Sequence, residues 1–345
     1  MGQGSSARVT KRAVRLPSFI SFPSKTFLIG EYAVMEGAPA LLVNTRPRFQ
    51  FDIQYPVKKS FHPFHKDSPA GLLIEENKKV FSSVSIQYSQ NYKSGFGLSG
   101  AEFNCVYLLS ALFKGVSVED IDCLDILEKY LSFVIPDLIR NPVVPVSLRS
   151  AVSVGTCTAS SSSPHHTSSP RRRGSSHSII PSGADIVSQW LGKVCIFSKP
   201  SIAESMDWPF RDLSFALIRT GENLQTWKHL ENLKQKNFSQ LKEISFVALE
   251  ALRSSSESLF VQSIQDYRKA LEEESLIHPS TTKILQELDS HPEILAAKGC
   301  GAMGAEVISV FFRKDAKNLN FLKNYNCISG LQSLDQGVLV NYDKR

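Results

Sequence analysis

The chain has no apolar run long enough to cross a bilayer, and its first fifteen residues lack the apolar core of a secretory signal peptide. Its six cysteines form no CxxC pair and no other metal-binding spacing. Cys105 and Cys195 stand inside apolar runs, where a thiol behaves as a small buried hydrophobic group. These absences favour a reducing compartment, predict no membrane partner and make the cytoplasm the expected location.

Signatures of nucleic-acid binding are equally scarce. The chain contains no zinc-finger spacing, no aromatic RNA-binding motif and no clear helix-turn-helix. Its net charge of +6 is modest, and part of it falls in two basic clusters within residues 8–15 and 171–173. This pattern is more typical of solvated arms and an anion-binding pocket than of a nucleic-acid surface. We therefore expect no nucleic-acid partner. A small acidic molecule is the expected partner, and the chain is expected to be a monomer or a homodimer.

The length of 345 residues suits two packed domains. Strand-like and helix-like segments mix without a regular βαβ repeat, which predicts an α+β fold. We expect a flexible N-terminal arm over residues 1–17, an N-terminal domain over 18–205 and a C-terminal domain over 206–345. Residues 134–178 are rich in proline, serine and arginine and have no sustained period, so they are predicted to be a mostly disordered insertion in the first domain.

Hydrophobic periodicity predicts the main elements. Residues 19–53 have the pattern of strand, turn and strand with residues 27–29 buried, and residues 101–113 are apolar nearly all round, as in a buried helix. Further helices are expected at 119–133, within 227–274 and at 280–288, the last capped by Ser280 and Thr281. Further strands are expected at 193–197, 214–218, 307–312 and 337–342.

Two segments are rich in glycine: residues 93–100, KSGFGLSG, directly before a predicted helix, and residues 298–306, KGCGAMGAE. Glycine permits positive φ and close backbone approach, so such a loop can direct several N–H groups at a phosphate. A helix that starts at once adds its free N–H groups and the positive end of its dipole. The first segment is not a Walker loop, and taken alone it is equally consistent with an ordinary tight turn.

Two charged residues have both an ordinary and a functional interpretation. Asp185 follows a glycine turn in PSGAD, residues 181–185, where an aspartate usually caps a helix. In a phosphate site the same carboxylate could accept a proton from a substrate hydroxyl. Lys25 heads a buried strand. It is either a surface lysine or a cation that neutralises charge on a transferring phosphoryl group.

Together these segments resemble the motifs of the galactokinase, homoserine kinase, mevalonate kinase and phosphomevalonate kinase (GHMP) superfamily. Residues 23–34, PSKTFLIGEYAV, resemble its first motif, residues 95–101, GFGLSGA, its phosphate-binding GLGSSA loop, and residues 298–305, KGCGAMGA, its third motif. Residues 181–185 resemble the segment that carries its catalytic aspartate. The matches occur in the family's order and spread over the chain outside residues 134–178.

The resemblance implies an N-terminal domain like ribosomal protein S5 domain 2 and a ferredoxin-like C-terminal domain. ATP and magnesium would be the cofactors, and the reaction would be phosphorylation of a small molecule. Asp185 would be the catalytic base and Lys25 its electrostatic partner. The nucleotide phosphates would lie on Gly95, Gly97, Ser99, Gly100 and Ala101, with Ser99 also a magnesium ligand. The substrate would contact Glu31, Tyr32, Thr220, Gly299, Gly301 and Gly304.

The sequence also departs from the family's pattern. Leu98 stands where the loop usually has its first serine, and Ser24 replaces a glycine of the first motif. Many members hold magnesium with a glutamate upstream of the aspartate segment, but here residues 134–178 occupy that region and no residue can be assigned the role. One phosphate or metal contact is therefore missing or supplied differently.

Within the superfamily, the residues point to the mevalonate pathway of isoprenoid biosynthesis. Tyr32, the run SGADIV that begins at Ser182, and Glu306 after the third motif resemble the phosphomevalonate kinases more than the mevalonate kinases, which favours phosphomevalonate over mevalonate as the substrate. A phosphorylated substrate needs an extra cation, and the sequence leaves three candidates open: Lys193, Arg219 and Lys228.

Two other functions remain in view. Because the insertion lies immediately before Asp185, the chain could be a non-catalytic or impaired ligand-binding protein with the same fold. It could also be a kinase for another small metabolite. A decarboxylase of the same fold is disfavoured, because it carries a different serine- and arginine-containing segment near the aspartate.

Overall fold

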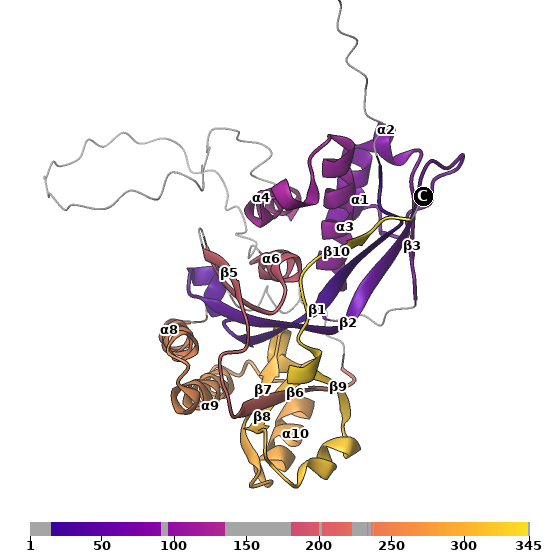
Figure 1. Ribbon diagram of the computed structural model, residues 1–345. Helices are drawn as coiled ribbons and strands as arrows, with labels where there is room; N and C mark the ends of the chain where they lie inside the picture. Colours follow the sequence, from indigo (N-terminus) through magenta and orange to yellow (C-terminus); the bar gives the residue numbers. More distant parts are fainter. Residues whose placement is uncertain are drawn as a thin grey trace, which may run out of the picture.

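The computed structural model describes residues 15–90, 96–134, 181–199, 202–222, 233, 236 and 238–343. It contains two antiparallel sheets (Figure 1), the first of which also carries helices on one face. The predicted N-terminal arm and the insertion at 134–178 lie almost entirely outside the described residues. So do Gly95, the first residue of the predicted phosphate loop, and Lys228.

The first sheet has the strand order β10-β1-β2-β4-β5, with β3 paired to β2. Its strands are β1 (Phe19–Ile29), β2 (Ala40–Gln54), β3 (Ser85–Tyr88), β4 (Val194–Ser198), β5 (Ile202–Met206) and β10 (Leu339–Asn341). Its helices are α1 (Pro69–Glu76), α2 (Lys78–Phe81), α3 (Leu98–Phe113), α4 (Cys123–Val134) and α6 (Ala184–Leu191). Short 3-10 turns lie at η1 (Ala33–Glu36) and η2 (Val118–Asp120).

The second sheet has the strand order β7-β8-β6-β9. Its strands are β6 (Leu213–Arg219), β7 (Ile294–Cys300), β8 (Val307–Arg313) and β9 (Asn326–Gly330). Along the chain, β6 and β7 are connected by the helices α8 (Ser239–Arg253), α9 (Glu257–Glu273) and α10 (Pro279–Asp289). The 3-10 turns are η3 (Ala302–Gly304), η4 (Leu319–Asn324) and η5 (Leu331–Ser333). When these four strands are numbered 1 to 4 along the chain, their order across the sheet is 2-3-1-4. This is the ferredoxin-like arrangement that the resemblance implied.

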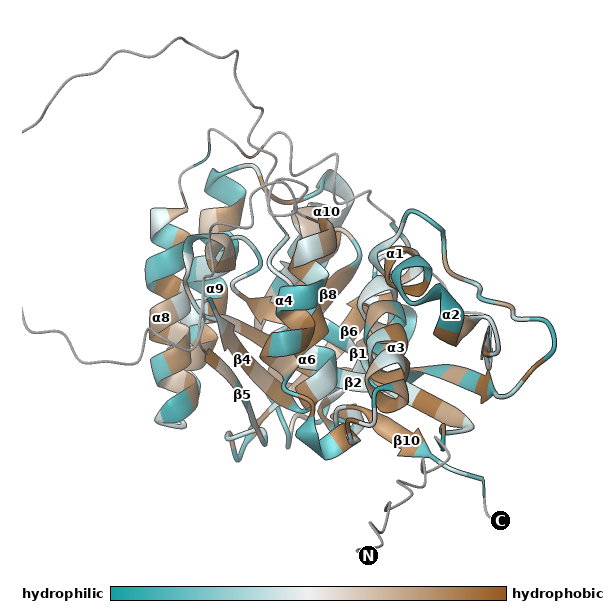
Figure 2. Ribbon diagram, turned by 90° about the horizontal axis from the view of Figure 1, so that it is seen from above, coloured by the Kyte–Doolittle hydropathy of each residue, from teal (hydrophilic) through white to brown (hydrophobic). Residues whose placement is uncertain are grey.

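The first sheet separates two hydrophobic cores, because alternate side chains of a strand point to opposite faces. On β2, Leu42 packs with the helices, whereas Leu41 and Val43 pack with the second sheet and its helices. Figure 1 shows this sandwich, with β1 and β2 between α3 and α6 on one side and β6–β9 on the other. The outer helices α4 and α8 carry both hydrophilic and hydrophobic residues (Figure 2), as expected of amphipathic helices that cover a core.

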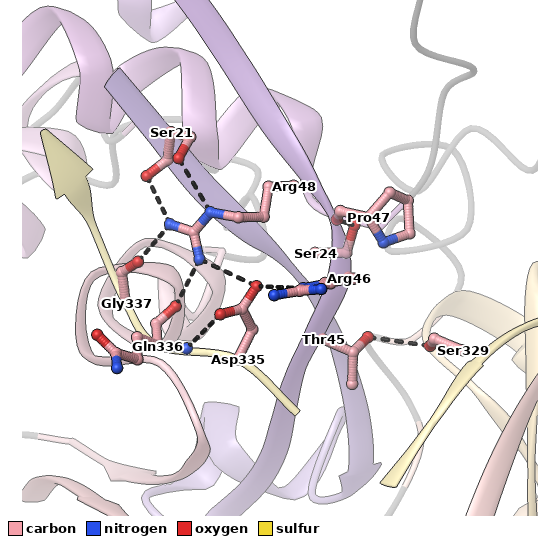
Figure 3. A network of polar contacts seen from close by, with 10 residues as sticks. All are labelled: Ser21, Ser24, Thr45, Arg46, Pro47, Arg48, Ser329, Asp335, Gln336 and Gly337. Atoms are coloured by element: carbon pink, nitrogen blue, oxygen red, sulfur yellow. Dashed lines mark hydrogen bonds and ion pairs between the residues drawn. The ribbon is translucent and has the colours of Figure 1, made fainter. Parts of the chain in front are cut away.

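The last part of the chain returns from the second sheet to the first, and we call residues 334–343 the C-terminal strap. Arg48 holds it in place (Figure 3) by donating to the carbonyls of Gln336 (2.9 Å) and Gly337 (2.6 Å), and to Ser21 at its hydroxyl and carbonyl, both 2.9 Å. Its guanidinium also lies 3.3 Å from Asp335. A guanidinium has five N–H donors, so this arginine is fully occupied by the fold.

Most predicted elements are present, with several corrections. Residues 19–53 form the predicted strand, turn and strand, and residues 27–29 are buried. The caps predicted for the helix at 280–288 are wrong: α10 begins at Pro279, and the His278 ring accepts the Ser280 N–H. The helix predicted from residue 119 begins only at Cys123.

The second glycine-rich segment is only partly a loop, since residues 298–300 are the end of β7. Strands β3, β5, β7 and β9 were not predicted. Cys105 and Cys195 are buried, as expected. Among the described residues, no helix is both long and apolar enough to span a membrane.

Candidate active site

Asp185 lies in the first turn of α6, where the helix dipole favours a carboxylate. The turn before it needs glycine: Gly183 has φ 73°, and a Cβ there would lie 2.2 Å from Leu127 of α4. This close approach sets α6 against α4. Asp185 itself is partly exposed, and together with burial its charge raises the pKa of the Tyr130 hydroxyl on α4.

The first glycine-rich loop brings Lys25 and Asp185 together at the start of α3. The Lys25 N–H on β1 donates to the carbonyl of Phe96, at 3.0 Å. A Cβ on Gly97 would lie 3.0 Å from Cγ of Lys25, and a Cβ on Gly100 would lie 3.2 Å from Oδ2 of Asp185. The loop can approach each charged side chain this closely only because both positions are glycine. Three segments distant in sequence thus form one cluster.

Gln189 is a further member of this cluster that the sequence did not single out. It follows Asp185 by one helical turn, and its side-chain amide donates to the carbonyl of Pro23, at 2.9 Å. Its Oε1 is buried without a partner among the described residues and would lie 2.7 Å from a Cβ on Gly100. The only sequence signal for it is the i,i+4 spacing from Asp185, which puts both side chains on one helix face.

On the side of the second sheet, Glu306 faces two cations. Burial raises the pKa of its carboxyl, while the nearby charges of Lys25 and Arg219 act in the opposite direction. Arg219 is the last residue of β6, and its guanidinium lies over the ring of Phe96, 5.7 Å from the centroid. Lys25, through its backbone N–H, and Arg219, through its guanidinium, therefore both approach Phe96 of the loop.

A buried ion pair lies under the cluster and joins the two domains. Nζ of Lys298 on β7 lies 2.5 Å from Oε1 of Glu31, and the two side chains are 0% and 4% exposed. The same Nζ donates to the Gly299 carbonyl at 2.7 Å and lies over the ring of Tyr267. Burial raises the pKa of the Glu31 carboxyl, although Lys298 and Lys25 act to lower it.

Most of the other residues predicted to contact substrate make contacts with backbone atoms of the protein itself. Tyr32 is buried, and its hydroxyl accepts the Met303 N–H at 2.9 Å. Gly299 and Gly304 pack against each other so closely that a Cβ on Gly299 would lie 2.8 Å from the Gly304 carbonyl oxygen. The Thr220 hydroxyl donates to the carbonyl of Ala305. Gly301, with φ 81°, faces open space. Substrate contact by these residues stays a prediction.

The start of α3 fits a polyanion such as the phosphates of ATP. Its N-cap is Gly97, which has no side chain with which to satisfy the first N–H groups of the helix. Ser99 is exposed in the first turn, and Ala101 behind it is buried. No cluster of three or more His, Cys, Asp or Glu in the described part of the chain could hold a metal. Magnesium needs no such cluster, because one or two protein ligands and substrate phosphates normally suffice.

A cavity of about 670 Å³ lies elsewhere on β2, lined by Arg46, Pro47, Arg48, Gln50, Gln90 and Ile328. It shares no residue with the cluster around Lys25 and Asp185. Its Arg48 is fully used by Ser21 and the C-terminal strap, and Arg46 reaches Asp335 at 3.4 Å. We therefore place the candidate active site at the cluster and not at this cavity.

Comparison with known proteins identifies the fold of the chain. No protein-family model and no curated protein sequence matches the chain. A Streptococcus pneumoniae phosphomevalonate kinase, solved with phosphomevalonate and AMPPNP, has a TM-score of 0.62 at 15% identity, with 90% of this chain and 98% of that one covered. An L. major mevalonate kinase, solved with R-mevalonate, has a TM-score of 0.56 at 14% identity, with 97% and 99% covered.

A Lactococcus lactis galactokinase, solved with galactose, has a TM-score of 0.60 at 10% identity, with 94% of this chain and 95% of that chain covered. The similarities extend over nearly the full length of every chain. The chain therefore has the two-domain α+β fold of GHMP kinases, as its motifs predicted.

Proposed function

We propose that this protein is an ATP-dependent small-molecule kinase that phosphorylates phosphomevalonate or mevalonate in the cytoplasm. One observation carries the proposal: a glycine-rich helix start packs closely against both Lys25 and Asp185, within a fold that solved small-molecule kinases share. A lone glycine loop, lysine or aspartate is common. Their juxtaposition supplies an anion cradle, a cation and a base at one place.

The roles follow from the chemistry of each group. The carboxylate of Asp185 accepts the proton of the substrate hydroxyl as the hydroxyl attacks the terminal phosphoryl group. Lys25 stabilises the negative charge that develops on that group. The backbone N–H groups at the start of α3 hold the nucleotide phosphates. ATP supplies the phosphoryl group, and residues 18–205 form the nucleotide-binding domain.

Magnesium is assigned to Ser99. The hydroxyl is exposed in the first turn of α3, next to Gly100, whose Cα faces the Asp185 carboxylate. A bound magnesium ion would neutralise phosphate charge there. Leu98 in place of the usual serine removes one hydroxyl from this turn, so metal affinity should be modest.

The mevalonate branch rests on Tyr32, the SGADIV run and Glu306. Of these, Glu306 lies beside Lys25, whereas the Tyr32 hydroxyl is engaged with the Met303 N–H. Residues 206–345 are assigned to the substrate side. The competing functions are a kinase for another metabolite and a ligand-binding protein without turnover.

The test is ADP release by the full chain with Mg-ATP and each of five acceptors: mevalonate, phosphomevalonate, diphosphomevalonate, homoserine and galactose. Asp185→Asn should lower turnover about 10²- to 10⁴-fold, the usual contribution of a general base. Asp207→Asn is the matched control, because the Asp207 side chain is 81% exposed and pairs with Lys193 on another part of the sheet.

Turnover on a mevalonate-series compound, lost in Asp185→Asn and kept in Asp207→Asn, supports the proposal. Turnover confined to homoserine or galactose would move the protein to another branch. ATP binding without turnover on any acceptor would favour the ligand-binding protein.

A further inference from the structure

Gln189 lies on α6 one helical turn after Asp185, and its side chain is completely buried. Its Nε2 donates to the carbonyl of Pro23 on β1 at 2.9 Å. A carbonyl oxygen can only accept a hydrogen bond, so the opposite orientation of the amide would set two acceptors against each other. The Pro23 carbonyl therefore fixes which end of the amide donates and leaves Oε1 at the other end.

The two ends of this amide face different parts of the first glycine-rich loop. A Cβ on Gly97 would lie 3.1 Å from Nε2, and the same point is 3.0 Å from Cγ of Lys25. A Cβ on Gly100 would lie 2.7 Å from Oε1, and the same point is 3.2 Å from Oδ2 of Asp185. The donor end of the amide is thus on the side of the lysine, and the acceptor end is on the side of the aspartate.

This orientation is the reverse of what an ionised aspartate needs. A carboxylate only accepts hydrogen bonds, and a glutamine one helical turn away can offer it an N–H. Here the amide oxygen is on that side instead, and it is buried without a hydrogen-bond donor among the described residues. The ammonium of Lys25 lies over the ring of Phe27, 4.7 Å from the centroid. A buried acceptor without a donor costs free energy, so a donor that appears only during the reaction would account for it.

We propose that Gln189 is a positioning residue that accepts a hydrogen bond from Asp185 once this aspartate has taken the proton of the substrate hydroxyl. The inference rests on the proposed kinase function and deepens it. As the hydroxyl oxygen bonds to the γ-phosphorus of ATP, the bond from that phosphorus to ADP breaks and the hydroxyl proton passes to the Asp185 carboxylate. The resulting acid has one O–H to donate, and Oε1 is the buried oxygen that receives it. The proton passes to solvent after the products leave.

A double-mutant cycle on stability tests this hydrogen bond without any need for turnover. Asp185→Asn places an N–H donor where the protonated acid has its O–H, and Gln189→Met keeps the side-chain length but removes the amide. Urea unfolding of wild type, both single variants and the double variant gives the effect of Asp185→Asn with and without Oε1. The loss of negative charge at the start of α6 is common to both backgrounds and cancels.

Asp185→Asn should favour folding about 2- to 10-fold more in wild type than in Gln189→Met, the range for one net hydrogen bond. Ser188→Ala is the control background, because the Ser188 hydroxyl donates to Oδ1 of Asn44 on β2 at 2.9 Å. That variant also removes a buried hydrogen bond of α6 but keeps the amide, so Asp185→Asn should act in it as in wild type. No coupling with Gln189→Met, or equal coupling with Ser188→Ala, overturns the proposal.

If Gln189→Met does not fold, NMR of the Gln189 side chain answers the same question. The signal of its carbonyl carbon should move downfield from wild type to Asp185→Asn, because Oε1 then accepts a hydrogen bond. A signal that does not move overturns the proposal.

Kinetics of the full chain distinguish this role from a purely structural one. Gln189→Met should lower kcat about 10-fold, while KM for ATP and for the small-molecule substrate change less than about 2-fold, because the hydrogen bond forms only as the proton is transferred. In the Asp185→Asn background the same substitution should lower kcat no further. A rise in either KM with kcat unchanged overturns the proposal. If wild type phosphorylates no substrate, the kinase function has failed, and the unfolding cycle still decides whether Oε1 is coupled to Asp185.

Discussion

At the scale of single residues, the absence of a side chain matters as much as its presence. Gly97 and Gly100 let the loop lie close to Lys25 and Asp185, and at Gly100 even a methyl group would approach both Asp185 and Gln189. The helix start is therefore shaped for close packing against charged groups. An anion bound there would be within reach of both the cation and the base.

Gly100→Ala tests this packing. Alanine is favoured in a helix, so the free energy of unfolding should change by less than about 1 kcal/mol. The added methyl would lie 2.7 Å from Oε1 of Gln189 and 3.2 Å from Oδ2 of Asp185, so these groups must move. A misplacement of this size should lower kcat about 100-fold in the ADP-release assay.

Gly115→Ala is the matched control for that variant. Gly115 has φ 81° and no atom within 4 Å of an added Cβ, so alanine adds backbone strain without a clash. It should cost about 1 kcal/mol in urea unfolding and leave kcat unchanged. Equal kcat in the two alanine variants would show that Gly100 does not position Asp185.

The sequence identified the charged residues of the cluster but not the amide between them. Asp185 and Lys25 could be chosen because each stands in a short motif with a recognisable chemistry. Gln189 has no such motif, and its importance arises only when α6 packs on β1 and α3. Tyr32 shows the opposite case, because its motif position suggested substrate contact while its hydroxyl holds the backbone of Met303.

At the scale of elements, the C-terminal strap fixes the end of the helix that carries Asp185. The Val338 N–H donates to the Trp190 carbonyl at 3.2 Å, and the Lys193 N–H donates to the Asp335 carbonyl at 2.7 Å. Gly337 lies so close that a Cβ would be 1.8 Å from the Trp190 carbonyl oxygen. The strap thus links the second sheet to the far end of α6.

Arg48→Met should remove the strap's main anchor. The side chain is 9% exposed and donates to three backbone carbonyls as well as to Ser21 Oγ and Asp335. Its loss leaves these acceptors unsatisfied and Asp335 without its buried partner. We expect a loss of about 3 kcal/mol or more in the free energy of unfolding, measured with urea.

Arg46→Met provides the comparison, because Arg46 approaches the same carboxylate but its side chain is 75% exposed. An exposed ion pair contributes less than about 1 kcal/mol, so this variant should be nearly as stable as wild type. Similar losses in the two variants would contradict a specific anchoring role for Arg48.

Two of the strands that the sequence did not predict take their stability from neighbouring strands. Strand β5 covers the edge of β4, and β9 pairs with β6 across a register shift, so neither needs a strong pattern of its own. The cap of α10 was misassigned because serine and threonine are the usual caps, whereas here the His278 ring takes that role. By contrast, β1, β2 and α3 could be predicted because their apolar periods are long.

At the scale of the whole molecule, the Glu31–Lys298 pair connects the domains through a place from which water is excluded. Removing one partner of a buried pair costs about 3–5 kcal/mol, because the other charge is left buried alone. Lys298→Met should therefore destabilise the protein strongly at pH 8. This can be measured by urea unfolding across a pH series.

The pH dependence has a defined sign. Burial already raises the pKa of Glu31 above its usual 4.5, and loss of Lys298 raises it further. The destabilisation of Lys298→Met is thus present above that raised pKa and is relieved as the pH falls through it, since a protonated Glu31 carries no charge. The deficit should be smaller at pH 5 than at pH 8, and adding Glu31→Gln should remove its pH dependence. A deficit that is independent of pH in Lys298→Met would contradict this account.

The four motifs, which occur in the order typical of the family, were enough to predict the architecture, because each motif belongs to a segment with a fixed place in that fold. The mutual position of the loop, Lys25 and Asp185 could be expected only through the resemblance. The charges contributed by the second sheet, Glu306 and Arg219, depend on the docking of two domains, which local pattern does not encode.

The most direct test of the central claim is to follow phosphorus NMR of the full chain with Mg-ATP and phosphomevalonate or mevalonate. The account predicts that the γ-phosphate signal of ATP is replaced by the signal of a phosphorylated acceptor. Asp185→Asn should slow this phosphoryl transfer about 10²-fold or more. Transfer that proceeds equally well in Asp185→Asn, or ATP that stays intact in the presence of either acceptor, would contradict it.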